Sequence, residues 1–363
     1  MAERLREVTN ADLDAIEIGA AILGTGGGGN PYIGKLRCRE ELKKGRRIPV
    51  IPLEELPDDA LVVSLGGIGA PVVGVEKIEE GEECLRALRA VEREVGKPVD
   101  ALISVEIGGA NSMEPMLTAA QAGLPVVDGD GMGRAFPEMQ MCTWSIYGHR
   151  EAPAAMADEK GSIVVIRDTP DDIWLERIAR AVVVTMGAAA GLATQPMRGA
   201  FVKRAAIPGT ITQALNLGRA VLNAHQTNAD PVQTVINQER GRLLMTAKIV
   251  DLERHLKGGF AVGHLALEGF GAFAGDTGRI DLQNEFLVFR RNGNVEVCTP
   301  DLVVVLDSDT GLPITTEMLR YGQRIAVLGL PAHPLMRSPE ALAVVGPAAF
   351  GYDDITFTPM ETS

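Results

Sequence analysis

The 363-residue sequence has few cysteines, no cluster of basic residues and no long apolar stretch, and each absence excludes a class of protein. The four cysteines are scattered and form no Cys-x-x-Cys pair, which argues against a disulfide framework or a thiolate zinc site. The formal net charge is -13, without a lysine-rich or arginine-rich run. Nucleic acids and anionic membranes bind basic footprints, so we expect neither as a partner.

Segments that address a protein to a membrane are also missing. No apolar stretch reaches the ~20 residues that a membrane-spanning helix requires. The N-terminal sequence MAERLREVTNADLDAIEIG is charged and lacks the apolar core of a signal peptide. We therefore expect a soluble, cytoplasmic protein whose partners are a small-molecule substrate and further copies of the same chain in a homo-oligomer.

The first half of the chain has the pattern of an α/β domain. Within residues 11–165, the short apolar runs ALVVSLGG, ALISVEIGG and LPVVDGDG end in glycine and have the character of strands. The segments between them show helical periodicity. Alternation of strands and helices predicts a three-layer α/β domain with a parallel or mixed sheet covered on both faces.

From about residue 240 the pattern changes to strand-like segments separated by turn residues. Asn292-Gly293, between FLVFR and VEVC, is a strong hairpin signal because a type I′ turn needs positive φ at both central positions. About six such strands predict a β-rich barrel or sandwich. We accordingly expect an α/β domain, a helical continuation packing on it, a β-rich domain, and a C-terminal segment that returns to the first domain, at residues 1–166, 167–235, 236–335 and 336–363.

The stretch ILGTGGGGNPYIGK, residues 22–35, has four consecutive glycines before a predicted helix start. Asn30 suits the N-cap of that helix and Pro31 its first position. Literal matches to GxGxxG and GxxxxGK stand in the wrong context, because a helix precedes the run and Leu36 replaces the Ser or Thr of a P-loop. We interpret the run as backbone that approaches a ligand; close packing and nucleotide binding are the alternatives.

Three further glycine-rich loops follow the strand candidates, at residues 66–69, 108–111 and 128–134. Ligands of parallel α/β sheets bind outside the carboxyl ends of the strands, so we expect all four loops to converge on one cleft. The polar side chains at this edge would be Glu106, Asn111, Asp128, Asp130 and Arg134. The backbone candidates for substrate binding are Gly26, Gly27, Gly28, Gly67 and Gly109.

The segment DGDGMGR places Asp128 and Asp130 two residues apart, with glycine between them. Such a pair can bind a divalent cation, act as acid and base, or hold substrate N–H groups. The structural alternative is an Asp-Gly turn stabilised by Arg134. We predict Asp128, Asp130 and Glu106 as catalytic residues, with Asn111 and Arg134 binding the substrate.

Known catalytic and metal-binding signatures are absent from the chain. The five histidines form no HxH or HExxH pair, no GxSxG elbow occurs, and no cysteine lies in a nucleophile motif. Any metal site would need ligands from distant segments. If a divalent metal ion serves as cofactor, the candidate ligands are Asp128, Asp130, His264 and His333.

Several segments resemble one family in order and spacing: LGTGGGGNPY, VSLGGIGAP, ISVEIGGANSMEPMLTAAQAGLPVVDGDGMGRAFPEMQM and GPAAFGYD. This is the S-methyl-thiohydantoin desulfurase-like family, which is associated with hydantoin utilisation. The resemblance covers nearly the whole chain. It implies an N-terminal α/β domain, a β-rich C-terminal domain, and hydrolysis of a thioether-bearing hydantoin ring with release of methanethiol. Fusion of some members to hydantoinase/oxoprolinase domains implies such enzymes as partners.

We therefore predict a hydrolase for a small cyclic amide of the hydantoin or S-methyl-thiohydantoin class. The first alternative is a non-catalytic metabolite-binding or accessory subunit of a hydantoinase/oxoprolinase-type system. The second is a nucleotide-dependent enzyme that uses the glycine run at residues 24–29.

Overall fold

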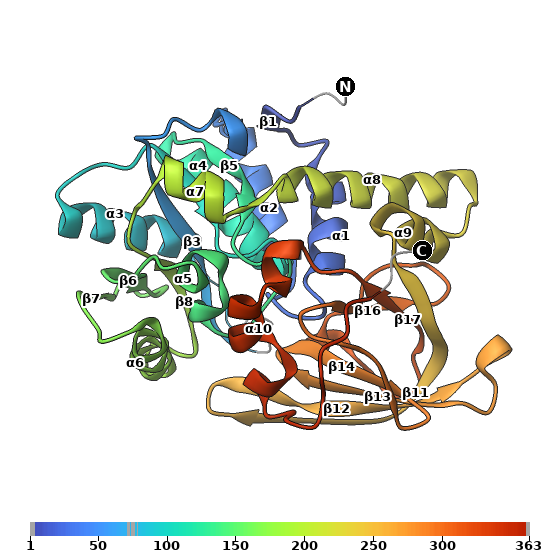
Figure 1. The fold of residues 1–363 in the computed structure, drawn as a ribbon. Coiled ribbons are helices and arrows are strands. Elements are labelled where there is room, and N and C mark those ends of the chain that lie inside the picture. The colour runs from blue at the N-terminus through green and yellow to red at the C-terminus, as the bar shows by residue number, and fades with distance from the viewer. Residues whose placement is uncertain (1–3, 71–72, 74–76, 78, 361–363) are drawn as a thin grey trace.

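The computed structural model describes residues 4–70, 73, 77 and 79–360, in which a layered α/β part is joined to a β-rich part (Figure 1). Among these residues, the first sheet has ten strands and is mixed. Its parallel centre consists, in spatial order, of β2 (Ile48–Pro52), β5 (Val126–Asp130), β4 (Ala101–Ser104) and β3 (Leu61–Gly69). The antiparallel additions are β1 (Glu7–Val8), β6 (Ala154–Ala157), β7 (Ile163–Ile166), β8 (Ala189–Ala193), β9 (Met197–Arg198) and β10 (Ile207–Pro208). The predicted α/β class is confirmed.

Helices cover this sheet, and several begin at a residue whose side chain caps the first turn. Asn30 caps α2 through its side chain, which accepts a hydrogen bond from the Tyr32 N–H at 2.9 Å, and Pro31 is the first helical residue, as predicted. Among the described residues, no helix is long and apolar enough to cross a membrane. The helices are α1 (Leu13–Leu23), α2 (Pro31–Lys43), α3 (Glu83–Val95), α4 (Met113–Ala122), α5 (Thr143–Ile146), α6 (Asp172–Thr185), α7 (Gly199–Ala205), α8 (Thr210–Thr227), α9 (Pro231–Glu239) and α10 (Pro339–Val345).

The β-rich part is an antiparallel sheet that curls into an open half-barrel around its own core (Figure 1). Asn292 and Gly293 join two of its strands with φ values of 51° and 82°, so the predicted hairpin is confirmed. In spatial order the strands are β15 (Asn294–Cys298), β14 (Glu285–Arg291), β13 (Thr277–Gln283), β12 (Phe260–Gly269), β11 (Arg242–Lys257), β17 (Arg324–Leu330) and β16 (Leu302–Asp307).

The chain after the half-barrel returns to the α/β part. Residues Met336, Ala341 and Val345, in and before α10, are buried in the core of the first sheet. Figure 1 shows this red segment lying between the two parts. The two parts are therefore held against each other by chain that belongs to the C-terminal end.

The glycine run between α1 and α2 is wedged against the half-barrel. The Phe286 N–H donates to the Thr25 carbonyl at 2.8 Å, and the Thr316 N–H donates to the Gly26 carbonyl at 2.8 Å. A side chain at Gly26 would overlap the Phe286 ring, and one at Gly27 would overlap the Glu285 carboxyl. Close packing, the alternative left open by the sequence, therefore accounts for this half of the run.

A single buried guanidinium, that of Arg134, links the same elements. It is 1% exposed. Its nitrogens donate to five oxygens, which are the carbonyls of Ala135 (3.0 Å), Pro300 (3.3 Å), Asp301 (2.9 Å) and Phe286 (3.1 Å) and the hydroxyl of Thr25 (2.7 Å). Burial lowers the pKa of Arg134 to about 10, which leaves it charged at neutral pH. Arg134 thus joins the loop after β5 to the half-barrel.

We expect Arg134→Lys to destabilise the protein by about 3 kcal/mol or more, because an ammonium group cannot reach all five acceptors and leaves buried carbonyls without donors. Urea unfolding followed by circular dichroism measures this loss. Arg89→Lys, on the half-exposed pair with Glu92, is the matched control, expected within about 0.5 kcal/mol of the wild type. Equal losses in both variants would contradict the role given to Arg134.

Candidate functional site

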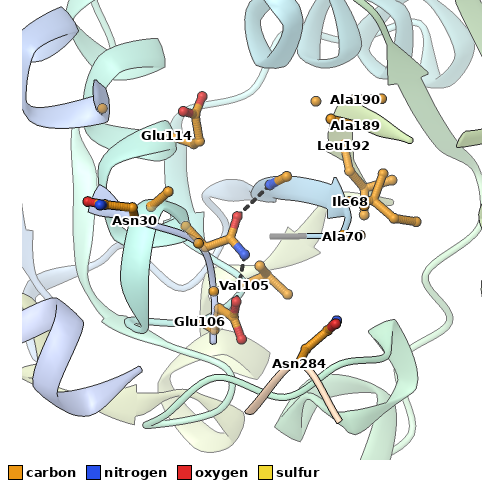
Figure 2. A pocket seen from close by; sticks show the side chains of 18 of the residues that line it. Asn30, Ile68, Ala70, Val105, Glu106, Glu114, Ala189, Ala190, Leu192 and Asn284 are labelled. Carbon is orange, nitrogen blue, oxygen red and sulfur yellow. Dashed lines mark hydrogen bonds between the residues drawn. The ribbon is translucent and has the colours of Figure 1, made fainter. Parts of the chain in front are cut away.

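A pocket of about 560 Å³ opens beyond the carboxyl ends of β3 and β4, against the half-barrel (Figure 2). Each of the four glycine-rich loops contributes to its wall, as the strand-end argument predicts. The half-barrel side adds residues that the sequence did not indicate. The lining from these segments comprises Gly28, Gly29, Gly67, Ile68, Gly69, Ala110, Asn111, Met132, Asn284, Glu285 and Met318.

Glu106, two residues after β4, is the best-positioned carboxyl group of the pocket. Its Oε1 accepts a hydrogen bond from Asn111 Nδ2 at 2.5 Å, and its Oε2 accepts one from the Phe136 N–H at 2.9 Å. Asn111 is itself oriented because its Oδ1 accepts from the Gly67 N–H at 2.5 Å (Figure 2). The amide therefore fixes the carboxyl in one orientation toward the cavity.

The environment of Glu106 favours its protonated form. Burial raises the pKa of this carboxyl to about 8, although the hydrogen bonds from Asn111 and Phe136 lower it. The negative charge of Asp130 raises the pKa further, and the positive charge of Arg134 lowers it. Glu106 can therefore gain or lose a proton near physiological pH, which is the property of a general acid or base.

Glu285, at the start of β14, is a second pocket carboxyl. It is 2% exposed, and within the described part of the chain its Oε2 has no hydrogen-bond partner. Burial and then the negative charge of Glu106 raise its pKa well above the usual range, while Arg134 and the Gly28 N–H lower it. Sequence reasoning missed Glu285; the available signal was a lone acid at the head of the apolar strand EFLVF.

The opposite corner of the pocket contains a thiol and an ion pair. Arg37 pairs with Glu79, and burial raises the pKa of neighbouring Glu114 to about 8. The Cys84 thiol donates to the Gly66 carbonyl at 3.5 Å, and burial raises its pKa well above the usual value. A thiol that stays protonated is a poor nucleophile, so Cys84 contributes to the wall rather than to covalent chemistry.

An apolar wall faces these polar groups. Ile68, Ala190 and Leu192 lie together on this side in Figure 2, and Met132 and Met139 also line the cavity. The pocket thus pairs an apolar surface with carboxyl groups whose charge is suppressed. Such a site suits a neutral polar ring with a small apolar substituent.

Asp128 is not in the described pocket lining and instead caps the start of a helix. Its Oδ1 accepts from the N–H groups of Ile211 (2.9 Å) and Thr212 (3.1 Å), and its Oδ2 accepts from the Thr212 hydroxyl at 2.6 Å. These donors belong to the first turn of α8, which begins after Gly209. Among the described residues, the pocket lining does not include Asp128, so its proposed catalytic role has no support in this geometry.

Asp130 is fully buried and holds two loops together. Its Oδ2 accepts from the N–H groups of Ile107 (2.7 Å), Gly133 (2.8 Å) and Met132 (3.2 Å), while burial raises its pKa to about 7. It too is outside the described lining. Because Ile107 adjoins Glu106, Asp130 acts on the pocket by fixing the backbone that presents Glu106. For this pair and Arg134, the structure therefore favours the structural alternative.

The predicted backbone contacts divide into two groups. Gly28 and Gly67 line the cavity, whereas Gly26, Gly27 and Gly109 are packed against neighbouring chain. A side chain at Gly109 would overlap the backbone of the glycine run.

The metal candidates do not form a group. Among the described residues, no three His, Cys, Asp or Glu side chains are arranged to hold a metal ion. His264 lies on β12, where its Nδ1 is 3.3 Å from Glu253 Oε2. His333 precedes a short 3-10 helix, where its Nδ1 accepts from the Leu335 N–H at 3.3 Å.

Comparison with known families matches residues 11–168 to the N-terminal domain, and residues 170–360 to the C-terminal domain, of S-Me-THD-like proteins. Among solved structures, a crystal structure of a protein from Chromobacterium violaceum is similar, with a TM-score of 0.81 and 23% identity over 98% of this chain and 100% of that chain. At this identity the likeness shows a shared fold. No curated protein matches the chain significantly.

We expect Asp128→Ala to destabilise the protein by about 1–2 kcal/mol, because the first turn of α8 loses its acceptors. Asp128→Asn keeps one acceptor oxygen and is expected to lose less. Urea unfolding of both variants measures the difference, with ligand binding in the pocket as the control. A wild-type free energy of unfolding in Asp128→Ala would contradict the capping role.

Proposed function

The chain belongs to the S-Me-THD-like family, and from its pocket we propose that it hydrolyses a small cyclic amide of the hydantoin class, with an S-methyl-thiohydantoin as the type substrate. The observation that carries the proposal is Glu106, a carboxyl at a strand end that is oriented by Asn111 and whose pKa is raised by burial to about 8.

The character of the pocket supports a ring substrate. A volume of about 560 Å³ accommodates such a ring with a substituent. Protonated carboxyls suit ring carbonyl oxygens, and the wall formed by Ile68 and Leu192 suits an S-methyl group.

The chemistry requires one activated water. Its oxygen attacks the ring carbon that bears sulfur, the carbon–sulfur bond breaks, and methanethiol and a ring carbonyl are formed. Glu106 in its ionised form takes the water proton. Asn111 positions that carboxyl through the hydrogen bond to Oε1.

The nucleotide alternative has little support from the contacts. Lys35, the lysine of the GxxxxGK match, is buried and pairs with Asp14 at 2.9 Å and with Glu17. The charge of Lys35 is therefore neutralised by carboxylates of α1 and is not directed at the glycine run. An accessory binding role keeps the same pocket and differs in having no turnover.

We expect the wild type to release methanethiol from an S-methyl-thiohydantoin, measured with a thiol reagent, and Glu106→Gln to lower kcat by about 10²–10⁴. Glutamine preserves the shape of the side chain but cannot accept the proton. Glu151→Gln is the matched control, because Glu151 is also buried with its pKa raised to about 7, yet lies outside the described pocket lining.

Two outcomes would contradict the proposal. Binding of the substrate without any release of methanethiol by the wild type would favour the accessory role. Wild-type turnover in Glu106→Gln would remove Glu106 from the reaction.

A further inference from the structure

Two carboxyl groups from different parts of the fold meet across the glycine run. Glu106 follows β4 of the α/β part, and Glu285 begins β14 of the half-barrel. A Cβ at Gly28 would lie 3.1 Å from Glu106 Oε1, and a side chain at Gly27 would overlap the Glu285 carboxyl. The two groups therefore lie beside consecutive glycines, and both line the same pocket.

The hydrogen bonding of the two carboxyls differs. Both oxygens of Glu106 have donors, from Asn111 and Phe136. Within the described residues Glu285 Oε2 has none, although the side chain is 2% exposed. Buried polar atoms in native proteins nearly always have a partner. Glu285 thus keeps one oxygen, enclosed in the wall of the pocket that this residue lines, for which the described chain supplies no donor.

The charges around the pair do not neutralise both carboxylates. Arg134 is the cation whose charge acts on both groups, and the negative charge of Asp130 acts on Glu106. The charge of Arg134 is also shared with Asp301. Since the charge of Glu106 opposes ionisation of Glu285, the two groups lose their protons in sequence and not together.

We propose that Glu285 is a second catalytic residue of this pocket and forms, with Glu106, a carboxyl pair in which Glu285 supplies a proton while Glu106 accepts one. The assignment rests on the hydrolysis proposed above. It makes the active site a joint product of the α/β part and the half-barrel.

The pair balances the reaction in two steps. In the addition, the water oxygen bonds to the sulfur-bearing carbon, a water proton passes to the Glu106 carboxylate, and Glu285 protonates the ring nitrogen that receives the C=N electron pair. In the elimination, the carbon–sulfur bond breaks, Glu106 returns its proton to the departing sulfur, and the proton of the added hydroxyl passes to Glu285. Both carboxyls end as they began, and the products are the ring carbonyl and methanethiol.

The kinetic test compares the pH dependence of kcat/KM in the wild type, Glu285→Gln and Glu106→Gln, with Glu151→Gln as control. We expect wild-type activity to rise near pH 8 as Glu106 ionises, and to fall at higher pH as Glu285 ionises. Glu285→Gln is expected to lose about 10²–10⁴ in kcat and the alkaline limb, while keeping the rise near pH 8. If Glu285→Gln turns over substrate like the wild type, with both the rise and the fall of kcat/KM with pH intact, the assignment is overturned.

A second measurement, the pH dependence of the free energy of unfolding, needs no substrate. The folded protein keeps protons on Glu106 and Glu285 that the unfolded chain releases above its ordinary glutamate pKa, so their contribution to the free energy of unfolding is lost as the pH rises through the folded pKa values. In Glu106→Gln the negative charge that opposes ionisation of Glu285 is gone. We therefore expect Glu285 to lose its proton at a lower pH in the folded variant, so that the midpoint of its titration moves to lower pH. In Glu285→Gln the Glu106 midpoint is expected to stay near pH 8, because Glu285 is neutral when Glu106 ionises.

The two readouts separate the two claims. Methanethiol release by the wild type with unchanged kinetics in Glu285→Gln would overturn the role of Glu285 and leave the hydrolysis standing. No methanethiol release by the wild type would overturn the hydrolysis together with the catalytic role. If the pH at which Glu285 ionises is the same in Glu106→Gln as in the wild type, the pairing is overturned, whether or not the wild type releases methanethiol.

Discussion

The close approach of the glycine run to the turn before β14 is the constraint on which the site depends. Gly26 and Gly27 have no space for a side chain, because the backbone of residues 25 and 26 is hydrogen-bonded directly to Phe286 and Thr316 and Gly27 packs on the Glu285 carboxyl. Arg134 fixes the same contact from the loop after β5. Without this junction, the half-barrel would contribute neither Asn284 nor Glu285 to the pocket.

Burial of carboxyl groups follows from that junction and gives the pocket its character. The chain as a whole is strongly acidic, with a net charge of -13. In the pocket, burial instead raises the pKa of Glu106 and Glu114 to about 8, and that of Glu285 well above its usual range. Low-dielectric surroundings disfavour the charged form of an acid. Neutral acids beside an apolar wall suit a neutral, hydrogen-bonding ligand, and the Arg37–Glu79 pair leaves a charged corner in the same pocket.

Local sequence patterns were sufficient for the fold class and for one side of the site. Strand candidates that end in glycine located the carboxyl edge of the parallel strands, and with it Glu106 and Asn111. The cap at Asn30 and the turn at Asn292-Gly293 depend on their own residues, so they could be predicted locally.

The remainder of the site depends on contacts that no local pattern reveals. The segment DGDGMGR contains a pair of acids, but Asp128 accepts a hydrogen bond from α8, 83 residues later in the chain, and Asp130 accepts one from the backbone beside Glu106. Their donors decide their role, and those donors are distant in sequence. For Glu285 the sequence offers only a lone acid before an apolar strand, because its neighbours, the glycine run and Arg134, come from the other part of the fold.

The central claim is that the junction buries the Glu106 and Glu285 carboxyls together and keeps them protonated at neutral pH. Infrared difference spectra of ligand-free protein with isotope-labelled glutamate measure this directly, because a carboxylic acid and a carboxylate absorb at different frequencies. We expect a protonated-carboxyl band in the wild type that decreases in both Glu106→Gln and Glu285→Gln, whereas Glu151→Gln retains the contribution of Glu106 and Glu285. Spectra in which neither substitution removes such a band, because both groups are carboxylates in the folded protein, would contradict it.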